Sequence, residues 1–356
     1  MLGIGSKNSF GIDIGTQTIK ISEVNKKNGR ILVENYAIWS NDITNIIQEK
    51  SGEHALSVEK IVSIIQMMLN SAQMNIKEAY MAIPSYLAFS TVIEMPALSA
   101  EELITAVPLE AKQHIPVPFD TVQLDWVNLG KKASKDTLNI LLIAIPNNVI
   151  TKYMEVSQAL GITIKGFELD VFSVIRSIDL PPKQVCIVDM GARTSTVSII
   201  NPDQQLQVLQ SFDFGGNHIT EAISQLKHIS LIEADLLKKN NGISGSDTEV
   251  SAAVQTRIRG FITNEVVRMI RQTQERSDFV IEDIILLGGF AKMSGIQEFV
   301  SMIIKNNFNT DKPIAVSMAI PTPNLTIKGV KDATIIHSTW QDLVLSIGIG
   351  LKDYNI

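Results

Sequence analysis

The stretch Asp13-Ile14-Gly15-Thr16-Gln17-Thr18 occurs again, in altered form, as Asp189-Met190-Gly191-Ala192-Arg193-Thr194. The same offset also places Ser22 on Ser198. In both copies an apolar strand leads into Asp-x-Gly, and a second strand with alternating apolar residues leads away. A polar turn then leads into a third strand. We therefore interpret the pair as a duplicated β-meander, which predicts an α/β protein with two similar lobes that face each other.

Length and composition agree with two lobes. The 356 residues exceed the size of one compact core, and 45% are hydrophobic. The net charge of −6 gives no footprint for nucleic acid, so no nucleic-acid partner is expected. The single cysteine, Cys186, excludes an intramolecular disulfide and lies in an apolar run. Neither a signal peptide nor an apolar run of membrane-spanning length is apparent, which predicts a cytoplasmic protein.

The elements along the chain divide it further. Residues 58–74 carry one apolar stripe at helical spacing, and residues 86–165 have the composition of a separate small α/β insertion. The predicted division is a first lobe at 1–85, the insertion at 86–165, a return to the first lobe at 166–182, a second-lobe core at 183–220, a helical subdomain at 221–282, more second-lobe core at 283–345, and a terminal helix at 346–356.

The two Asp-x-Gly turns have the chemistry of a phosphate site. Backbone N–H groups can cradle the phosphates of ATP where small residues allow close approach, and Gly15 and Gly191 provide this. Asp13 and Asp189 are predicted to hold Mg²⁺ through its water shell. Either turn alone would be unspecific, but two copies at one offset favour a site. The remaining predicted phosphate contacts are the hydroxyls of Thr16, Thr18 and Thr194 and the ammonium of Lys20 on the outgoing strand.

A third element is an apolar strand that ends in a glycine pair. Residues 284–287 lead into Gly288-Gly289-Phe290, and a helix follows. Such a pair lets an adenine or a ribose lie against the backbone, although an ordinary strand-to-helix turn explains it equally well when it is taken alone.

The three elements, in this order, resemble the superfamily of actin, the sugar kinases and the heat-shock chaperones. The resemblance implies an actin-like (ribonuclease H-like) duplicated fold. It also implies further nucleotide contacts at Gln17, Ala192 and Arg193 in the hairpins, at Gly215 and Gly216 after the second meander, and at Asp235 and Lys238. The superfamily usually has glutamate where this chain has Asp235.

The insertion narrows the resemblance. Residues 110–119 (Glu-Ala-Lys-Gln-His-Ile-Pro-Val-Pro-Phe), followed by Asp125-Trp126, are similar to the small extra domain of the type IV pilus assembly protein family PilM, and less closely to that of FtsA. This implies an ATP-binding scaffold at the inner face of the cytoplasmic membrane. It further implies a first-lobe groove for the N-terminal cytoplasmic tail of PilN and contacts with other platform proteins. Contact with the membrane would come only through these partners, and a homo-oligomer stays an open possibility.

Enzymatic and structural alternatives stay open. The superfamily places a carboxylate or amide near the attacking water, and Asp170 is the candidate for slow ATP hydrolysis, although a helix-cap role explains it as well. A small-metabolite kinase would need a further catalytic base between the lobes. A filament-forming relative of FtsA would carry a membrane helix after the core, whereas this sequence stops at Ile356.

Overall fold

Two mixed β-sheets with the same strand order form the centre of the protein. The structure is a computed structural model that describes residues 8–40, 56–131, 136–276, 280–308 and 312–354. In each lobe the first three strands form an antiparallel meander, and the fourth and fifth join parallel to the first. The orders are β3-β2-β1-β4-β8 in the first lobe and β11-β10-β9-β12-β13 in the second. The predicted duplicated, actin-like α/β fold is confirmed.

The strands follow the sequence patterns closely. The two meanders begin at the same places relative to their Asp-x-Gly turns. The first-lobe strands are β1 (Ser9–Ile14), β2 (Thr18–Lys27), β3 (Arg30–Ser40), β4 (Glu78–Ile83) and β8 (Thr163–Leu169), and the second-lobe strands are β9 (Val185–Met190), β10 (Ser195–Ile200), β11 (Leu206–Phe212), β12 (Asp283–Leu287) and β13 (Ala315–Met318).

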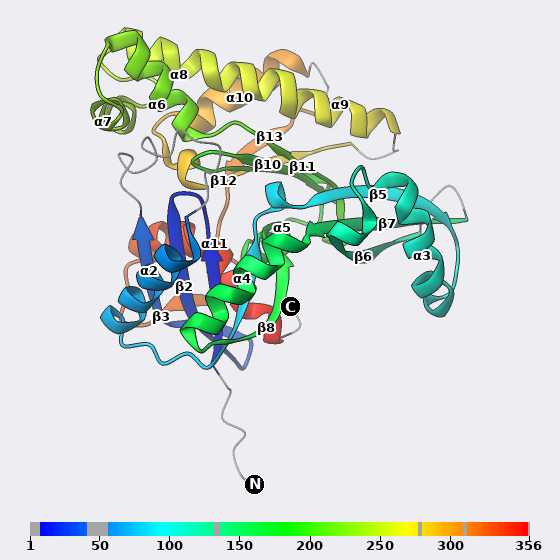
Figure 1. The fold of residues 1–356 in the computed structure, drawn as a ribbon. Coiled ribbons are helices and arrows are strands. Elements are labelled where there is room, and N and C mark those ends of the chain that lie inside the picture. Colours follow the sequence, from blue (N-terminus) through cyan, green and yellow to red (C-terminus); the bar gives the residue numbers. More distant parts are fainter. Residues whose placement is uncertain (1–7, 41–55, 132–135, 277–279, 309–311, 355–356) are drawn as a thin grey trace.

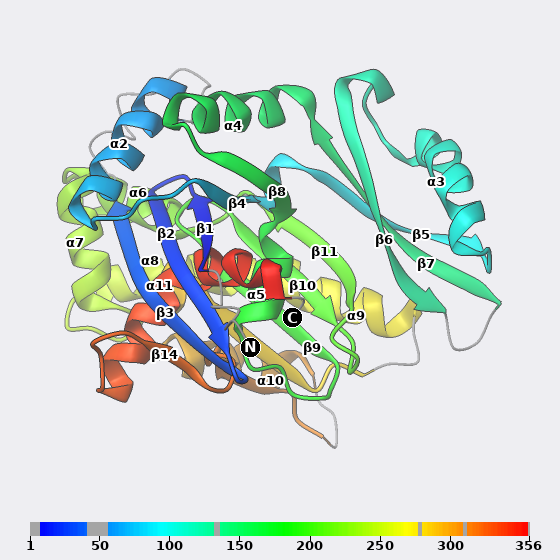
Figure 2. The ribbon, with the colours of Figure 1, turned by 90° about the horizontal axis from the view of Figure 1, so that it is seen from below.

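Helices cover both faces of each sheet and produce five layers (Figure 1). In the first lobe α2 (Val58–Ser71) and α4 (Asn147–Leu160) lie on the outer face, as the view from below shows (Figure 2). Between the two sheets, α5 (Asp170–Ser177) and α11 (Ala333–Gly350) share one core with both of them. The second lobe is covered on its outer face by α6 (Gly216–Lys227), α7 (Leu231–Asn241), α8 (Thr248–Phe261), α9 (Val267–Arg276) and α10 (Ile296–Asn307).

The inserted subdomain is smaller than the sequence predicts. It consists of a three-stranded sheet in the order β5-β7-β6 with α3 (Ala100–His114) packed on it around a core of its own. Predicted to reach residue 165, it ends at Pro146, because Tyr153 and Val156 of α4 pack into the first-lobe core and β8 pairs with β4. Its strands are β5 (Phe89–Pro96), β6 (Val122–Lys131) and β7 (Thr137–Pro146).

The C-terminal part of the chain returns to the first lobe, which corrects the predicted boundary at residue 345. A short strand, β14 (Leu325–Ile327), pairs with β3 and widens the first sheet to six strands. The predicted terminal helix at 346–356 overlaps only the end of α11, which begins at Ala333 with Asp332 as its N-cap and ends at Gly350, and the 3-10 turn Leu351–Tyr354 that follows it. Because Trp340, Leu343 and Ile347 are buried between the sheets, α11 is a core helix of the interface between the lobes.

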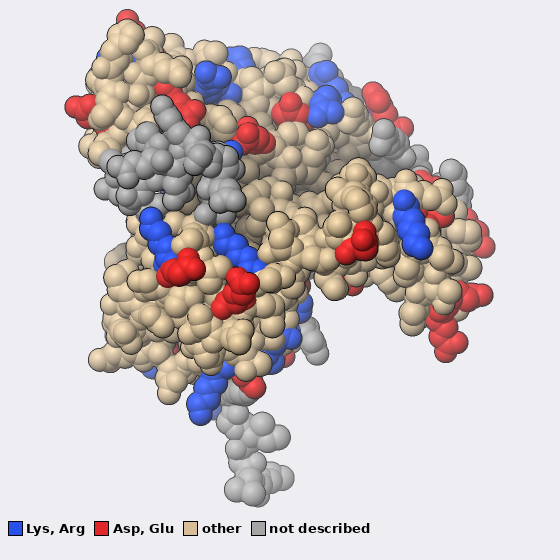
Figure 3. Space-filling model, in the orientation of Figure 1, with Lys and Arg blue, Asp and Glu red and all other residues tan. Residues whose placement is uncertain are grey.

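The surface has no large region of one charge on the face shown in Figure 3, where acidic and basic residues are interspersed. The same view shows an open notch between the first lobe and the inserted subdomain. None of the helices in the described parts of the chain combines the length and the apolar character that a bilayer crossing requires.

Candidate nucleotide-binding cleft

The two Asp-x-Gly hairpins lie on either side of one cavity between the lobes. Each closes with the same hydrogen bond, from the Gly15 amide to the Thr18 carbonyl (2.9 Å) and from the Gly191 amide to the Thr194 carbonyl (3.0 Å). The cavity has a volume of about 930 Å³ and takes in residues of both hairpins, of α7, of α11 and of the turn after β12. This volume is of the size that holds a small-molecule cofactor.

The cleft holds more acidic than basic charge near the hairpins. Asp13 is buried, and its Oδ2 atom lies 3.2 Å from the Lys20 Nζ atom. Burial is the main cause that raises the pKa of Asp189 to about 7, and the negative charge of Asp170 is the second cause. The positive charge of Lys20 lowers this pKa, but only in part. Burial also raises the pKa of Asp170 to about 6, although hydrogen bonds from Ser85 and the Val171 amide hold it down. The cleft is therefore electrostatically suited to a cation.

Magnesium fits this donor set only through water. Among the described residues, no group of three or more His, Cys, Asp or Glu side chains could hold a metal ion directly. Mg²⁺ keeps several of its waters and commonly takes one or two carboxylates together with phosphate oxygens. Asp13 and Asp189 are therefore suited to accept hydrogen bonds from metal-bound water, as the sequence predicts.

The N-terminus of α6 sits directly on the second hairpin. The Gly216 amide donates to the Gly191 carbonyl (3.0 Å) and the Asn217 amide to the Ala192 carbonyl (2.7 Å). A Cβ atom on Gly215 would lie 2.6 Å from the Ala192 carbonyl oxygen, so only glycine allows this approach. The glycine pair thus fixes the hairpin to the helix, and backbone dipoles of the helix point toward the cleft.

Asp235 and Lys238 of α7 interact mainly with each other and with α6. The buried Lys238 Nζ atom contacts Asp235 Oδ1 (2.7 Å), the Thr220 hydroxyl (2.7 Å) and the Gly216 carbonyl (3.1 Å). Desolvation lowers the pKa of this lysine. The other carboxylate oxygen of Asp235 pairs with Lys239 at 2.6 Å. Both predicted residues line the cavity, but their closest partners are protein groups.

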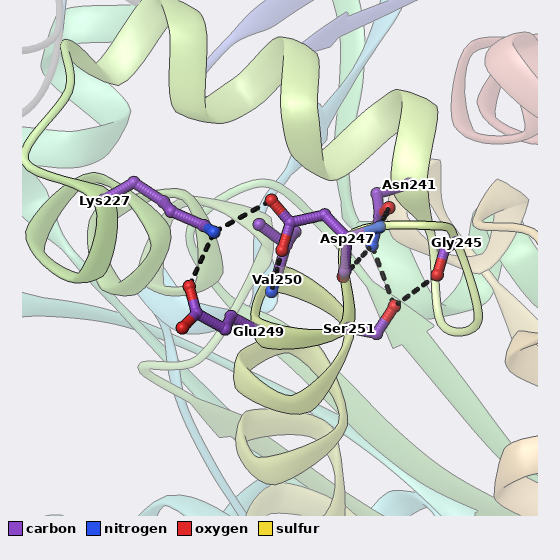
Figure 4. A network of polar contacts seen from close by, with 7 residues as sticks. All are labelled: Lys227, Asn241, Gly245, Asp247, Glu249, Val250 and Ser251. Atoms are coloured by element: carbon purple, nitrogen blue, oxygen red, sulfur yellow. Dashed lines mark hydrogen bonds and ion pairs between the residues drawn. The ribbon is translucent and has the colours of Figure 1, made fainter.

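The loop after α7 supports the glycine element that follows β12. The Ile243 amide donates to the Ser294 carbonyl (3.2 Å), next to Met293 of the cavity wall. A polar network holds this loop in place (Figure 4). In that network Asn241 bonds both to Asp247 and to Ser251, while Lys227 joins Asp247 and Glu249 at 2.9 and 2.7 Å.

Two polar contacts bridge the lobes across the cleft. The Gln17 side-chain amide of the first hairpin donates to Asn217 Oδ1 on α6 (3.2 Å). At the other end, Lys292, in the turn after β12, forms an ion pair with Asp342 of α11 (2.6 Å). Both pairs line the cavity, so a change in the separation of the lobes changes them directly.

Comparison with known proteins identifies the family. The family model described as type IV pilus assembly protein PilM matches residues 11–354. The chain belongs to the PilM family. It is also 21% identical over 224 residues to the cell division protein FtsA of Agrobacterium fabrum (strain C58), which is 53% of this chain and 50% of that protein. The PilM-family chain thus spans about half the length of the curated relatives it matches.

Solved structures share the fold over nearly the whole chain. A PilM–PilN type IV pilus biogenesis complex superposes with a TM-score of 0.79 at 16% identity and 98% coverage of both chains. The ethanolamine utilization protein EutJ of Carboxydothermus hydrogenoformans gives 0.55 at 14% identity, covering 98% of this chain and 91% of EutJ. MreB5 of Spiroplasma citri bound to AMPPNP gives 0.53 at 12%, covering 98% and 96%. These likenesses establish the actin-like fold of the PilM-family chain.

Most of the predicted site residues meet in the cleft, and two of those that the structure describes, Arg193 and Gly215, do not line it. Arg193 lines a second cavity instead, and its Nε atom lies 3.8 Å from Asp213 Oδ1. Gly215 lies behind the second hairpin, and the side chain of Phe290 is outside the described residues. The predicted residues that line the cavity are Asp13, Gly15, Thr16, Gln17, Thr18, Lys20, Asp170, Asp189, Gly191, Ala192, Thr194, Gly216, Asp235, Lys238, Gly288 and Gly289.

Other lining residues of the PilM-family chain were not predicted. Asn217 and Lys239 directly follow predicted residues, so their position beside a motif was the available signal. Tyr86 and Asp342 come from η1 (Ser85–Leu87) and α11, far from any motif. Only the packing of those elements against the hairpins brings them to the cavity.

Proposed function

We propose that this chain is a Mg-ATP-binding scaffold of the inner-membrane assembly platform of type IV pili. In this role it binds the N-terminal cytoplasmic tail of PilN, and the bound nucleotide sets the affinity for that tail. The observation that carries the nucleotide part is the single cavity that joins both hairpins to the glycine turn after β12. Family membership carries the pilus part.

The residues of the cleft have separate roles in this proposal. The hairpin amides and hydroxyls bind the phosphates, and Lys20 supplies a positive charge to them. Asp13 and Asp189 orient the waters of Mg²⁺, which would neutralise phosphate charge when bound. Gly288 and Gly289 let the nucleoside lie against the backbone. Asp170 lines the same cavity and would orient a water beside the terminal phosphate for a slow hydrolysis.

The inserted subdomain supports the partner part. A solved relative is a PilM–PilN complex, and this chain matches its fold over 98% of both chains. The notch between the first lobe and the insertion offers a concave surface for an extended tail (Figure 3). Recruitment through a tail of PilN would hold the protein at the inner face of the cytoplasmic membrane.

Lobe closure connects the two parts. Since Gln17–Asn217 and Lys292–Asp342 cross the cleft, a ligand bound between them favours one lobe separation over others. A nucleotide can change tail affinity only to the extent that it binds the lobe arrangements differently. ATP and ADP differ by one phosphate at the hairpins, which is where the two lobes face each other.

The test is a fluorescence anisotropy titration of a labelled peptide that copies the cytoplasmic N-terminus of the cognate PilN. It is read with Mg-ATP, with Mg-ADP and without nucleotide. Saturable binding that differs between nucleotides supports the whole proposal. Equal binding in all states would reduce ATP to a structural ligand, and absence of binding would refute the partner.

A further inference from the structure

One short segment connects the cleft with the inserted subdomain. The chain leaves β4 at Ile83 and enters β5 at Phe89, so only residues 84–88 lie between them. Within this segment Pro84 and Tyr86 line the nucleotide cavity. The turn is tight, because the Leu87 amide donates to the Pro84 carbonyl at 2.9 Å. The first strand of the insertion is therefore fixed to the cleft wall with little slack.

Ser85 anchors this segment to the carboxylate at the start of α5. Its side chain is 4% exposed, and its hydroxyl donates a hydrogen bond to Asp170 Oδ1. A buried hydroxyl that bonds a carboxylate is costly to leave without its partner. The position of the Asp170 carboxylate and the position of the segment are therefore linked.

The same segment also touches the second lobe. A second cavity, of about 570 Å³, lies between residues 85–90 and strand β11. Tyr86 and Thr16 line both cavities. Elements η1 and β5 contact β11 directly, so the insertion meets the second lobe at this seam. A shift of the lobes thus reaches residues 84–88 from two sides, through Asp170 and through β11.

We propose that the Ser85–Asp170 hydrogen bond couples the nucleotide state of the cleft to the inserted subdomain. This inference rests on the proposed function and names how the partner surface is regulated. The third phosphate of ATP adds negative charge to a cleft that already contains Asp13, Asp170 and Asp189. This charge acts on the Asp170 carboxylate, Ser85 follows its acceptor, and β5 moves with Ser85. With ADP this additional charge is missing, and residues 84–88 keep the position that they have without the third phosphate.

The experiment compares Ser85→Ala with the matched control Ser157→Ala. Ser157 is also 4% exposed and lies in the same lobe, but its hydroxyl bonds the Met154 carbonyl within its own helix. The tail peptide is titrated with Mg-ATP and with Mg-ADP, and nucleotide affinity is measured separately. If wild type shows an ATP-to-ADP affinity ratio of at least about fivefold, we expect S85A to bring it within about twofold of one. S157A should keep the wild-type ratio.

The outcomes separate the two proposals. A wild-type ratio of one refutes nucleotide control of the tail, and with it this inference, whereas the binding of ATP and of the tail still stands. A wild-type ratio that S85A leaves unchanged, at normal nucleotide affinity, overturns only the role of Ser85.

Hydrogen exchange gives a second measurement that needs no peptide. Amide exchange of β5 should differ between Mg-ATP and Mg-ADP in wild type and in S157A, and this difference should vanish in S85A. Its persistence in S85A would overturn the inference. Ser85→Cys, which keeps the size but is a weaker donor, replaces S85A if the alanine variant does not fold, as judged by circular dichroism.

Discussion

The two hairpins share a backbone but differ in charge. In the first, Asp13 lies opposite Lys20 in the β1–β2 register, and the two side chains form an ion pair. In the second, Asp189 lies opposite Thr196 at the same place of the β9–β10 register. Thr196 turns to Ser211 of β11 instead, at 3.2 Å. The duplication therefore repeats the turn, and one substitution on the outgoing strand changes its electrostatics.

This difference assigns separate tasks to the two copies. The first hairpin carries a lysine that can approach phosphate oxygens, and its carboxylate is already partly neutralised. No ion pair to Asp189 is found within the described part of the chain, and the pKa of this residue is raised to about 7. A carboxylate in that state gains most from a cation. We therefore interpret the first hairpin as the phosphate side and the second as the metal side.

The largest expected effect comes from the strand beside each hairpin. Asp13 lies opposite Ala82 of β4, and Asp189 lies opposite Leu287 of β12. The residue that follows on this neighbouring strand is Ile83 in the first lobe and Gly288 in the second. Gly288 has a φ of +89°, and a Cβ atom there would lie 2.4 Å from Asp189 Oδ1. We expect Gly288→Ala to destabilise the protein by on the order of 3 kcal/mol and to abolish nucleotide binding.

Gly289→Ala is the matched control for stability, because a Cβ atom on Gly289 meets no protein atom within 4 Å. Denaturant unfolding of both variants measures the effect on stability, and nucleotide titration of Gly288→Ala measures the effect on binding. Equal stability of the two variants would show that the second hairpin does not depend on close approach by this turn.

The second prediction concerns magnesium. We expect Asp189→Asn to lower the affinity for Mg-ATP by about tenfold or more, the size of effect found when groups that orient metal ligands are lost. Asp13→Asn should lose less of the magnesium-dependent part, because Lys20 already shares that carboxylate. Titrations of each variant with ATP, with and without Mg²⁺, separate the two contributions. A larger magnesium dependence at Asp13 would reverse the assignment of the two sides.

Local pattern sufficed for the parts of the site that repeat. Gly15 and Gly191 could be placed in matching turns because each is flanked by alternating strands. The direction of Arg193 could not be predicted, since it depends on the position of Asp213 at the end of β11. Nor could the sequence reveal that α11 crosses between the sheets and brings Asp342 to the cleft. Such contacts depend on packing between segments far apart in the chain.

The smallest expected effect is a pH dependence that belongs to the second hairpin alone. Asp189 has a folded-state pKa of about 7, whereas an unfolded aspartate ionises near pH ~3.9. Since the folded protein holds this proton more tightly, stability is highest in acid and falls as the pH rises between these two values. From pH 6 to pH 8 the loss for the nucleotide-free protein is about 1 kcal/mol, or ~2 °C in Tm.

Asp189→Asn removes the titrating group and isolates its contribution. Thermal melts of the nucleotide-free wild type and D189N at pH 6 and pH 8 should therefore show a smaller pH dependence in the variant. Asp170, whose pKa is raised to about 6 for the same main reason, retains its own smaller part of the slope in both proteins. Identical slopes in wild type and variant would mean that Asp189 ionises freely in the folded protein. In that case the two hairpins would not differ in the way their partners Lys20 and Thr196 imply.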